Sequence, residues 1–176
     1  MEIRAAFKTD MQQIAQLHAK SWQDIYREEL SDTYLSHDIY QDRCQVWQQR
    51  FLFPKKNQQI FVACNNGENK IHGFICFYLA NHSQWGTLIE NLHISKNCKG
   101  IGLGKQLLQT AARLTHNKNP NHGMYLEVLA SNKAAQAFYQ KYGAQHIKNQ
   151  QWQAPDGNLV NEYVYRWNSI SLLIHS

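Results

Sequence analysis

Residues 99–108 read KGIGLGKQLL, a stretch unlike any other in this 176-residue chain. Gly100, Gly102 and Gly104 place three of the chain's nine glycines within five positions, between two lysines. Glycine lets the backbone turn sharply, so that successive N–H groups can point into one concavity. The first N–H groups of a helix lack partners within the helix and favour negative charge. The stretch therefore predicts a phosphate-binding loop that leads into a helix.

Two common phosphate-binding loops do not fit this stretch. The Walker loop G-x-x-x-x-G-K-[ST] fails because Gln106 follows Gly104-Lys105, and because Lys99 stands where its first glycine belongs. The dinucleotide fingerprint G-x-G-x-x-G fails because the third glycine comes one residue too early. The region before the loop also reads as antiparallel strands rather than as a βαβ unit.

Hydrophobic periodicity on both sides of the loop alternates between the repeat of strands and the repeat of helices. A mostly antiparallel sheet with helices packed on it, in one domain covering residues 1–176, explains this order. The predicted fold class is α+β, with mixed α/β character. Strands are predicted over 2–7, 59–64, 70–79, 86–94, 122–129, 145–152 and 159–167, and helices over 10–26, 37–52, 103–116 and 131–143.

Capping and turn residues support several of these boundaries. Thr9, with Gln12 three residues later, is predicted to cap the first helix. Asn66-Gly67 is predicted to form a hairpin turn. Ser131 or Asn132 is expected to cap the last predicted helix.

The loop is similar to R/Q-x-x-G-x-G/A, the pyrophosphate loop of the Gcn5-related N-acetyltransferases (the GNAT family). Lys99-x-x-Gly102-x-Gly104 matches it except at the first position, where lysine keeps the charge but lacks the planar fork of arginine. The resemblance covers nearly the whole chain and is strongest from about residue 86 to 145, where Asn132 precedes the aromatic pair Phe138-Tyr139.

The resemblance implies the GNAT fold, a central twisted sheet of about seven strands with helices on both faces. Its fourth and fifth strands are expected to splay apart and admit the pantetheine arm of acetyl-CoA. The family transfers an acetyl group from this co-substrate directly to an amine, without a metal. The implied cofactor-binding residues are Leu92, His93, Ile94, Lys99, Gly100, Ile101, Gly102, Leu103, Gly104, Lys105, Asn132, Phe138 and Tyr139.

The expected chemistry needs a proton acceptor and a proton donor, because an amine with a pKa near 10.4 is protonated at neutral pH. Tyr139 matches the tyrosine that family members place near the CoA sulfur, and is expected to protonate the thiolate. Glu127 and Glu90 both lie among apolar sequence neighbours, where desolvation would raise a carboxyl pKa. Either glutamate, or water, could take the proton of the amine. A backbone N–H near residues 92–94 could stabilise the oxyanion.

The acceptor site in this family is shaped by the first two helices and the last hairpin. Here these segments carry Trp22, Tyr26 and Tyr34, and Glu28 lies in an acidic stretch that could receive a cationic amine. A solvated helix end would explain the same acidic residues, so both interpretations stay open.

Composition and charge argue against nucleic-acid binding, membrane insertion and secretion. The net charge of +5 suits an anionic partner, but no long Lys/Arg run favours nucleic acid. No apolar run is long enough to span a membrane, and the N-terminus does not read as a signal peptide, so a cytoplasmic protein is expected. The four cysteines are expected to be free thiols, no metal site is predicted, and exposed aromatic residues could support a homodimer. A non-catalytic acyl-CoA-binding module and a nucleotide-binding protein remain the alternatives.

Overall fold

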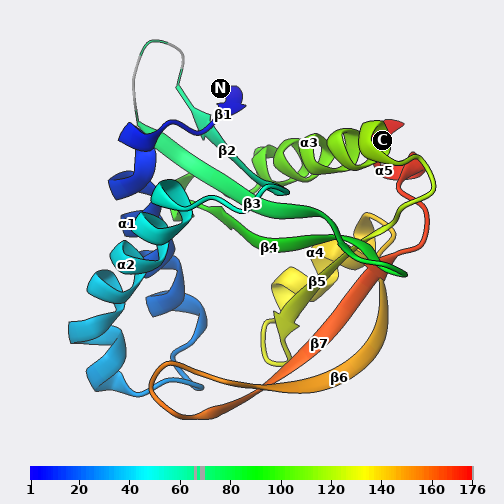
Figure 1. Cartoon of the computed structure of the whole chain (residues 1–176). Coiled ribbons are helices and arrows are strands. Elements are labelled where there is room, and N and C mark those ends of the chain that lie inside the picture. The colour runs from blue at the N-terminus through cyan, green and yellow to red at the C-terminus, as the bar shows by residue number, and fades with distance from the viewer. Residues whose placement is uncertain (66, 68–69, 176) are drawn as a thin grey trace. The chain divides into compact units, whose positions relative to one another are not determined.

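The structure is a computed structural model that describes residues 1–65, 67 and 70–175 (Figure 1). In this described part, a seven-stranded sheet has the order β1-β2-β3-β4-β5-β7-β6. Neighbouring strands are mostly antiparallel, and the β4–β5 pair is parallel, so the predicted α+β class is confirmed. Asn66, half of the predicted hairpin dipeptide, lies outside the described residues.

Most predicted elements are present within a few residues of their expected ends. The strands are β1 (Glu2–Ala5), β2 (Gln58–Cys64), β3 (Ile71–His82), β4 (Gly86–Ile94), β5 (Met124–Leu129), β6 (Gln145–Gln153) and β7 (Leu159–Trp167). The helices are α1 (Met11–Ile25), α2 (Ile39–Leu52), α3 (Leu103–Lys118), α4 (Lys133–Lys141) and α5 (Ser171–His175). The short helix α5 was not predicted.

The chain forms two compact units, and the first comprises Met1–Cys76 with Asn91–Leu107. Within it, α1 and α2 pack side by side, as their blue and cyan ribbons show in Figure 1. Their interface buries Trp47, whose Nε1 donates to Nδ1 of His18 at 3.1 Å. Aromatic rings therefore form much of the core of this unit.

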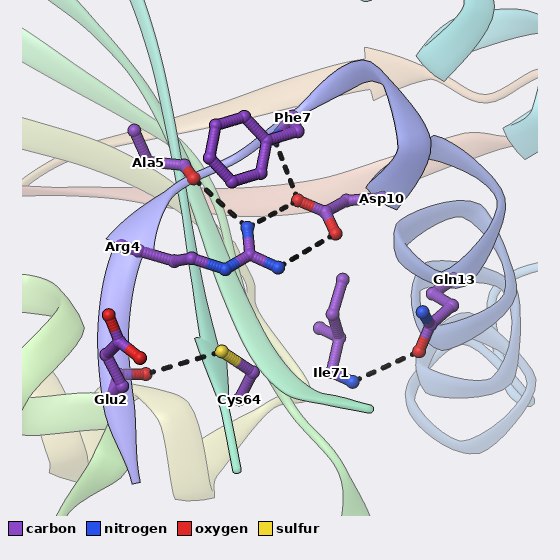
Figure 2. A network of polar contacts seen from close by, with 8 residues as sticks. All are labelled: Glu2, Arg4, Ala5, Phe7, Asp10, Gln13, Cys64 and Ile71. Carbon is purple, nitrogen blue, oxygen red and sulfur yellow. Dashed lines mark hydrogen bonds and ion pairs between the residues drawn. The ribbon is translucent and has the colours of Figure 1, made fainter. Parts of the chain in front are cut away.

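The start of α1 differs from the prediction. The helix begins at Met11 after a short 3-10 turn, and Asp10 rather than Thr9 organises it. The Asp10 carboxylate accepts the Phe7 N–H at 2.7 Å and binds the Arg4 guanidinium at 2.6 and 3.0 Å (Figure 2). The predicted Thr9–Gln12 cap is wrong because a charged acceptor with two partners occupies this turn.

The second unit comprises Phe77–Glu90 and the described residues from Leu108 onward. Here β4 pairs with β5 in parallel through Thr87–Ile89 and Met124–Leu126, and both strands continue beyond this short ladder. The hairpin of β6 and β7 completes this part of the sheet, in orange and red in Figure 1.

The β5–β7 register decides which side chains of this unit share a face. Glu127 lies opposite Val164, and Leu129 lies opposite Glu162, so these four residues point to one side of the sheet. Alternation puts Glu90 on that side as well, since Leu88 pairs with Tyr125. We call this side, with Glu90, Glu127 and Glu162, the acidic face.

Helix α4 packs on the other side of β7. Gln140 donates to the Tyr165 hydroxyl at 3.2 Å, and the Tyr139 ring meets Trp167 edge-on at 5.9 Å. Asn132 caps α4 as predicted, because its Oδ1 accepts the Ala135 N–H at 3.1 Å. None of the helices in the described part of the chain has the length and hydropathy needed to cross a bilayer. All four cysteines are free thiols, as predicted.

Candidate functional site

The glycine-rich loop, residues 99–105, belongs to the first unit, and we call it the phosphate cradle. Gly100 and Gly102 adopt φ of +82° and +88°, in the left-handed region that side chains disfavour. The first α3 hydrogen bond of this end runs from the Gln106 N–H to the Gly102 carbonyl at 3.1 Å. The N–H groups of Leu103, Gly104 and Lys105 therefore precede the helical ladder and suit an anion.

The start of the cradle is tied to strand β3. Cys98, the residue before Lys99, is buried, and its Sγ lies 3.3 Å from Nδ1 of His72. Lys99 and Ile101 are exposed, so the cradle presents its charge and its backbone to solvent. The geometry expected of a phosphate loop is present, with lysine at its first position.

His93 on β4 lies close to the charges of the same unit. Its Nδ1 is 2.7 Å from the Ser21 hydroxyl, and its ring lies 4.7 Å from that of His18. Burial, together with the positive charges of Arg43 and Lys99, lowers the pKa of His93 to about 3. The imidazole is therefore uncharged at neutral pH and is a poor proton acceptor. Leu92, His93 and Ile94 are all half-buried along this strand.

The apolar surroundings predicted for Glu90 and Glu127 are not found. Both side chains are exposed. The reason is the alternation of a strand: the apolar sequence neighbours of Glu127, Leu126 and Val128, point to the opposite side of the sheet. Apolar residues next to a glutamate in the sequence of a strand therefore do not indicate that its side chain is surrounded by apolar groups.

Glu162 on β7 is the buried carboxylate of the acidic face, and sequence reasoning missed it. The residue is 8% exposed, and Gln150 Nε2 lies 3.5 Å from its Oε2. Burial and then the charge of Glu127 raise the pKa of Glu162 to about 7, against the opposing effect of the Gln150 hydrogen bond. The sequence did hold one sign of this burial, because Glu162 shares a strand face with Val160 and Val164, which are both buried.

Tyr139 is buried on α4, with its ring edge-on to Phe138 at 5.2 Å. Burial raises the pKa of Tyr139 above its ordinary value, so the phenol keeps its proton throughout the neutral range. Because α4 covers the side of β7 that carries Trp167, Tyr139 and Glu127 belong to opposite sides of the sheet.

The end of β5 is held against the start of α4 by a buried glutamine. Gln136 Nε2 donates to the carbonyls of Leu129 and Ala130 at 2.8 and 3.0 Å. Asn132 uses Oδ1 for its cap, and Phe138 is half-buried nearby on the same helix. The residues expected to contact pantetheine in this unit are thus fixed by α4 rather than by a flexible loop.

The predicted acceptor residues fall into two environments. Trp22 is buried and stacks on Tyr26 at 4.4 Å, while the Arg43 guanidinium covers Trp22 at 4.1 Å. Glu28 is exposed beyond the end of α1. In the described residues, no three His, Cys, Asp or Glu side chains form a group that could hold a metal ion.

Comparisons with known proteins agree with this architecture. An uncharacterized N-acetyltransferase of Methanocaldococcus jannaschii is 33% identical over 75 residues, 42% of this chain and 48% of that protein's length. The PaiA N-acetyltransferase of Thermoplasma acidophilum, solved with coenzyme A, superposes with a TM-score of 0.67 at 18% identity, covering 92% of this chain and 96% of that one. The ribosomal-protein-S18-alanine N-acetyltransferase of Escherichia coli gives 0.66 at 17% identity, covering 94% and 91%.

Identities below 25% show the fold alone, and family membership rests on a separate match. The acetyltransferase (GNAT) family matches residues 19–144, which include the C-terminal part of α1, the phosphate cradle and α4. This is more than half of the chain, and the chain therefore belongs to the GNAT acetyltransferase family.

Proposed function

We propose that this protein transfers the acetyl group of acetyl-CoA to a primary amine of a small molecule or peptide. The observation that carries the proposal is the phosphate cradle, in which two left-handed glycines lead into the first N–H groups of α3, ahead of the helical ladder. Support comes from the PaiA structure, which has this fold and holds coenzyme A.

The residues proposed to bind acetyl-CoA belong to the phosphate cradle, to β4 and to α4 with its cap. In the first unit, the cradle receives the diphosphate, and the β4 backbone takes the pantetheine arm and stabilises the oxyanion. In the second unit, α4 supplies the remaining contacts. The proposed residues are Leu92, His93, Ile94, Lys99, Gly100, Ile101, Gly102, Leu103, Gly104, Lys105, Asn132, Phe138 and Tyr139.

The proposed reaction is direct attack of the amine nitrogen on the thioester carbonyl. Tyr139, which stays protonated at neutral pH, gives a proton to the departing thiolate. The sequence offers Glu127 and Glu90 as candidates for taking the proton of the ammonium group. Trp22, Tyr26 and Glu28 are the proposed acceptor-side residues, and a cationic amine fits the exposed carboxylate of Glu28.

The central test measures CoA release over a panel of primary amines, with the Tyr139→Phe variant alongside the wild type. We expect turnover with at least one amine, and a fall in kcat of about 100-fold in the variant, the usual size of one acid-catalytic contribution. Tyr142→Phe changes a nearby tyrosine at the end of the same helix and serves as the control, with kcat near the wild-type value. Full activity of Tyr139→Phe would remove this residue from the mechanism, and CoA binding without any turnover would instead indicate a non-catalytic acyl-CoA-binding module.

The cradle is tested by binding alone. Gly102 has φ of +88°, and a Cβ at this position would meet open space, so Gly102→Ala adds backbone strain without a clash. A left-handed alanine costs about 1–2 kcal/mol. The free loop avoids this cost by leaving the left-handed conformation, and binding must restore it, so we expect the Kd for CoA in calorimetry to rise about 5- to 30-fold. Gly157→Ala introduces the same strain at φ of +89° in the β6–β7 turn and should leave the Kd unchanged. Equal Kd values for all three proteins would place the diphosphate elsewhere.

A further inference from the structure

Two carboxylates of the described chain, Asp10 and Glu162, are more than nine-tenths buried, and they differ in one respect. Asp10 is neutralised by Arg4, whose Nη1 lies 2.6 Å from its Oδ2. Among the described residues, no ion pair includes Glu162, and its carboxylate instead accepts a long hydrogen bond from Gln150 at 3.5 Å. Burying a carboxylate without a counter-charge destabilises the folded state, so such a group often has a functional reason.

The surroundings of Glu162 add negative rather than positive charge. Glu127 lies on the adjacent strand two residues from Leu129, the register partner of Glu162, and Glu90 lies on the same face. Both carboxylates act electrostatically on Glu162. The negative charge of this face favours a cation such as an ammonium group, and Glu162 is its enclosed member.

We propose that Glu162 is the catalytic residue that takes the proton from the ammonium group of the acceptor, with Glu127 and Glu90 drawing the cation to this face. The inference rests on the proposed function and refines it, because it moves the base from the exposed strand glutamates to a buried one. The amide of Gln150 contacts the Glu162 carboxylate through a long hydrogen bond of 3.5 Å.

The proton and electron balance of the step is simple. The N–H bond of the ammonium breaks and its proton joins a Glu162 oxygen, which leaves a free electron pair on nitrogen. That pair forms the C–N bond, the C–S bond breaks, and the thiolate takes a proton from Tyr139. The nitrogen loses its second proton to water, and Tyr139 is reprotonated from water. Glu162 then releases its proton to solvent, so the sum is ammonium plus thioester giving amide, thiol and one proton.

The titration of Glu162 supports this role. Burial and the charge of Glu127 raise its pKa to about 7 from the ordinary 4.5. Relative to an unperturbed glutamate, the equilibrium for taking a proton from an ammonium group improves by more than about two orders of magnitude. About half of the carboxylate is still ionised near neutrality, the compromise that favours a general base.

The test is the pH profile of kcat/KM for an amine that turns over in the screen. Wild type should lose activity as pH falls through about 7, because the Glu162 carboxylate becomes protonated. Glu162→Gln should lower kcat/KM at pH 8 by about 100- to 1000-fold and remove this acid limb. Glu162→Asp keeps a carboxylate, so it should be faster than Glu162→Gln and should again lose activity as the pH falls.

Two further variants separate the base from its neighbours. Glu127→Gln removes a negative charge that raises the Glu162 pKa, so the acid limb should persist but move to lower pH. Glu2→Gln changes an exposed glutamate of β1 and should leave the profile unchanged. Loss of the limb in Glu127→Gln, together with its retention in Glu162→Gln, would overturn the proposal in favour of Glu127.

Folding of the variant is checked by melting. A buried ionised Glu162 opposes folding, so Glu162→Gln should melt above the wild type at pH 8 and close to it at pH 5. Wild type that binds CoA but turns over no amine would overturn the proposed function and this inference with it. Wild type that turns over an amine, with an unchanged profile in Glu162→Gln, would overturn this inference alone.

Discussion

Replacing Gly123 by alanine is expected to abolish folding of the second unit, at a cost of more than about 4 kcal/mol. A Cβ at this position would overlap the carbonyl oxygen of Trp167 and lie 3.3 Å from its carbonyl carbon. Both are backbone atoms of β7, so no side-chain rotation relieves the overlap. Because the next residue, Met124, pairs with Trp167, the clash would separate β5 from β7 at the start of their ladder.

Gly86, at the start of β4, lies against the backbone of Gly123 and leaves no room for a side chain either. Its own Cβ would overlap the Gly123 carbonyl oxygen, which also accepts the Thr87 N–H at 3.1 Å, and its φ is +86°. Three backbone segments therefore approach closely where β4 and β5 begin and β7 ends. Circular dichroism and thermal melting of Gly123→Ala test this, with Gly157→Ala as the control, where a Cβ meets open space. A melting temperature of Gly123→Ala within a few degrees of wild type would contradict the expected overlap.

Local patterns were sufficient to predict most of the elements. The strand over residues 86–94 and the cap of α4 by Asn132 depend on alternation and on a short-range hydrogen bond, and both are readable within ten residues. The helix after the cradle is marked by Leu107, Leu108 and Ala111, which are fully buried. Helix α5 was missed because its five residues are too few to display a helical period.

Features that depend on contacts between distant segments could not be predicted in the same way. The close approach at Gly86 and Gly123 involves a third segment more than 40 residues further along the chain, at Trp167. The cradle glycines were readable because their φ angles serve a local turn. Burial of Glu162, in contrast, depends on which side of the sheet its neighbours cover. A glutamate in phase with buried valines was the one local sign of it.

Replacing Asp10 by alanine is expected to lower the free energy of unfolding by about 3–4 kcal/mol, because removal of one partner leaves the other charge uncompensated. The Asp10 side chain is 5% exposed and that of Arg4 is 19% exposed, so the Arg4 guanidinium would lose its partner in a poorly hydrated place. The Phe7 N–H would lose its acceptor as well (Figure 2). Urea denaturation of the variant measures the change directly.

The pH dependence of this effect distinguishes an ion pair from a packing loss. Burial alone would raise the pKa of Asp10, but the bonds from Arg4 and from the Phe7 N–H outweigh it and leave the pKa lowered. The unfolded state therefore binds more protons than the folded state near the ordinary value of 3.8, and the contribution of Asp10 is present above that pH. It is lost as pH falls through the folded pKa, so the wild type and Asp10→Asn should converge in stability in acid. A difference that stays constant from pH 7 to pH 2 would show that Asp10 acts through its shape rather than its charge.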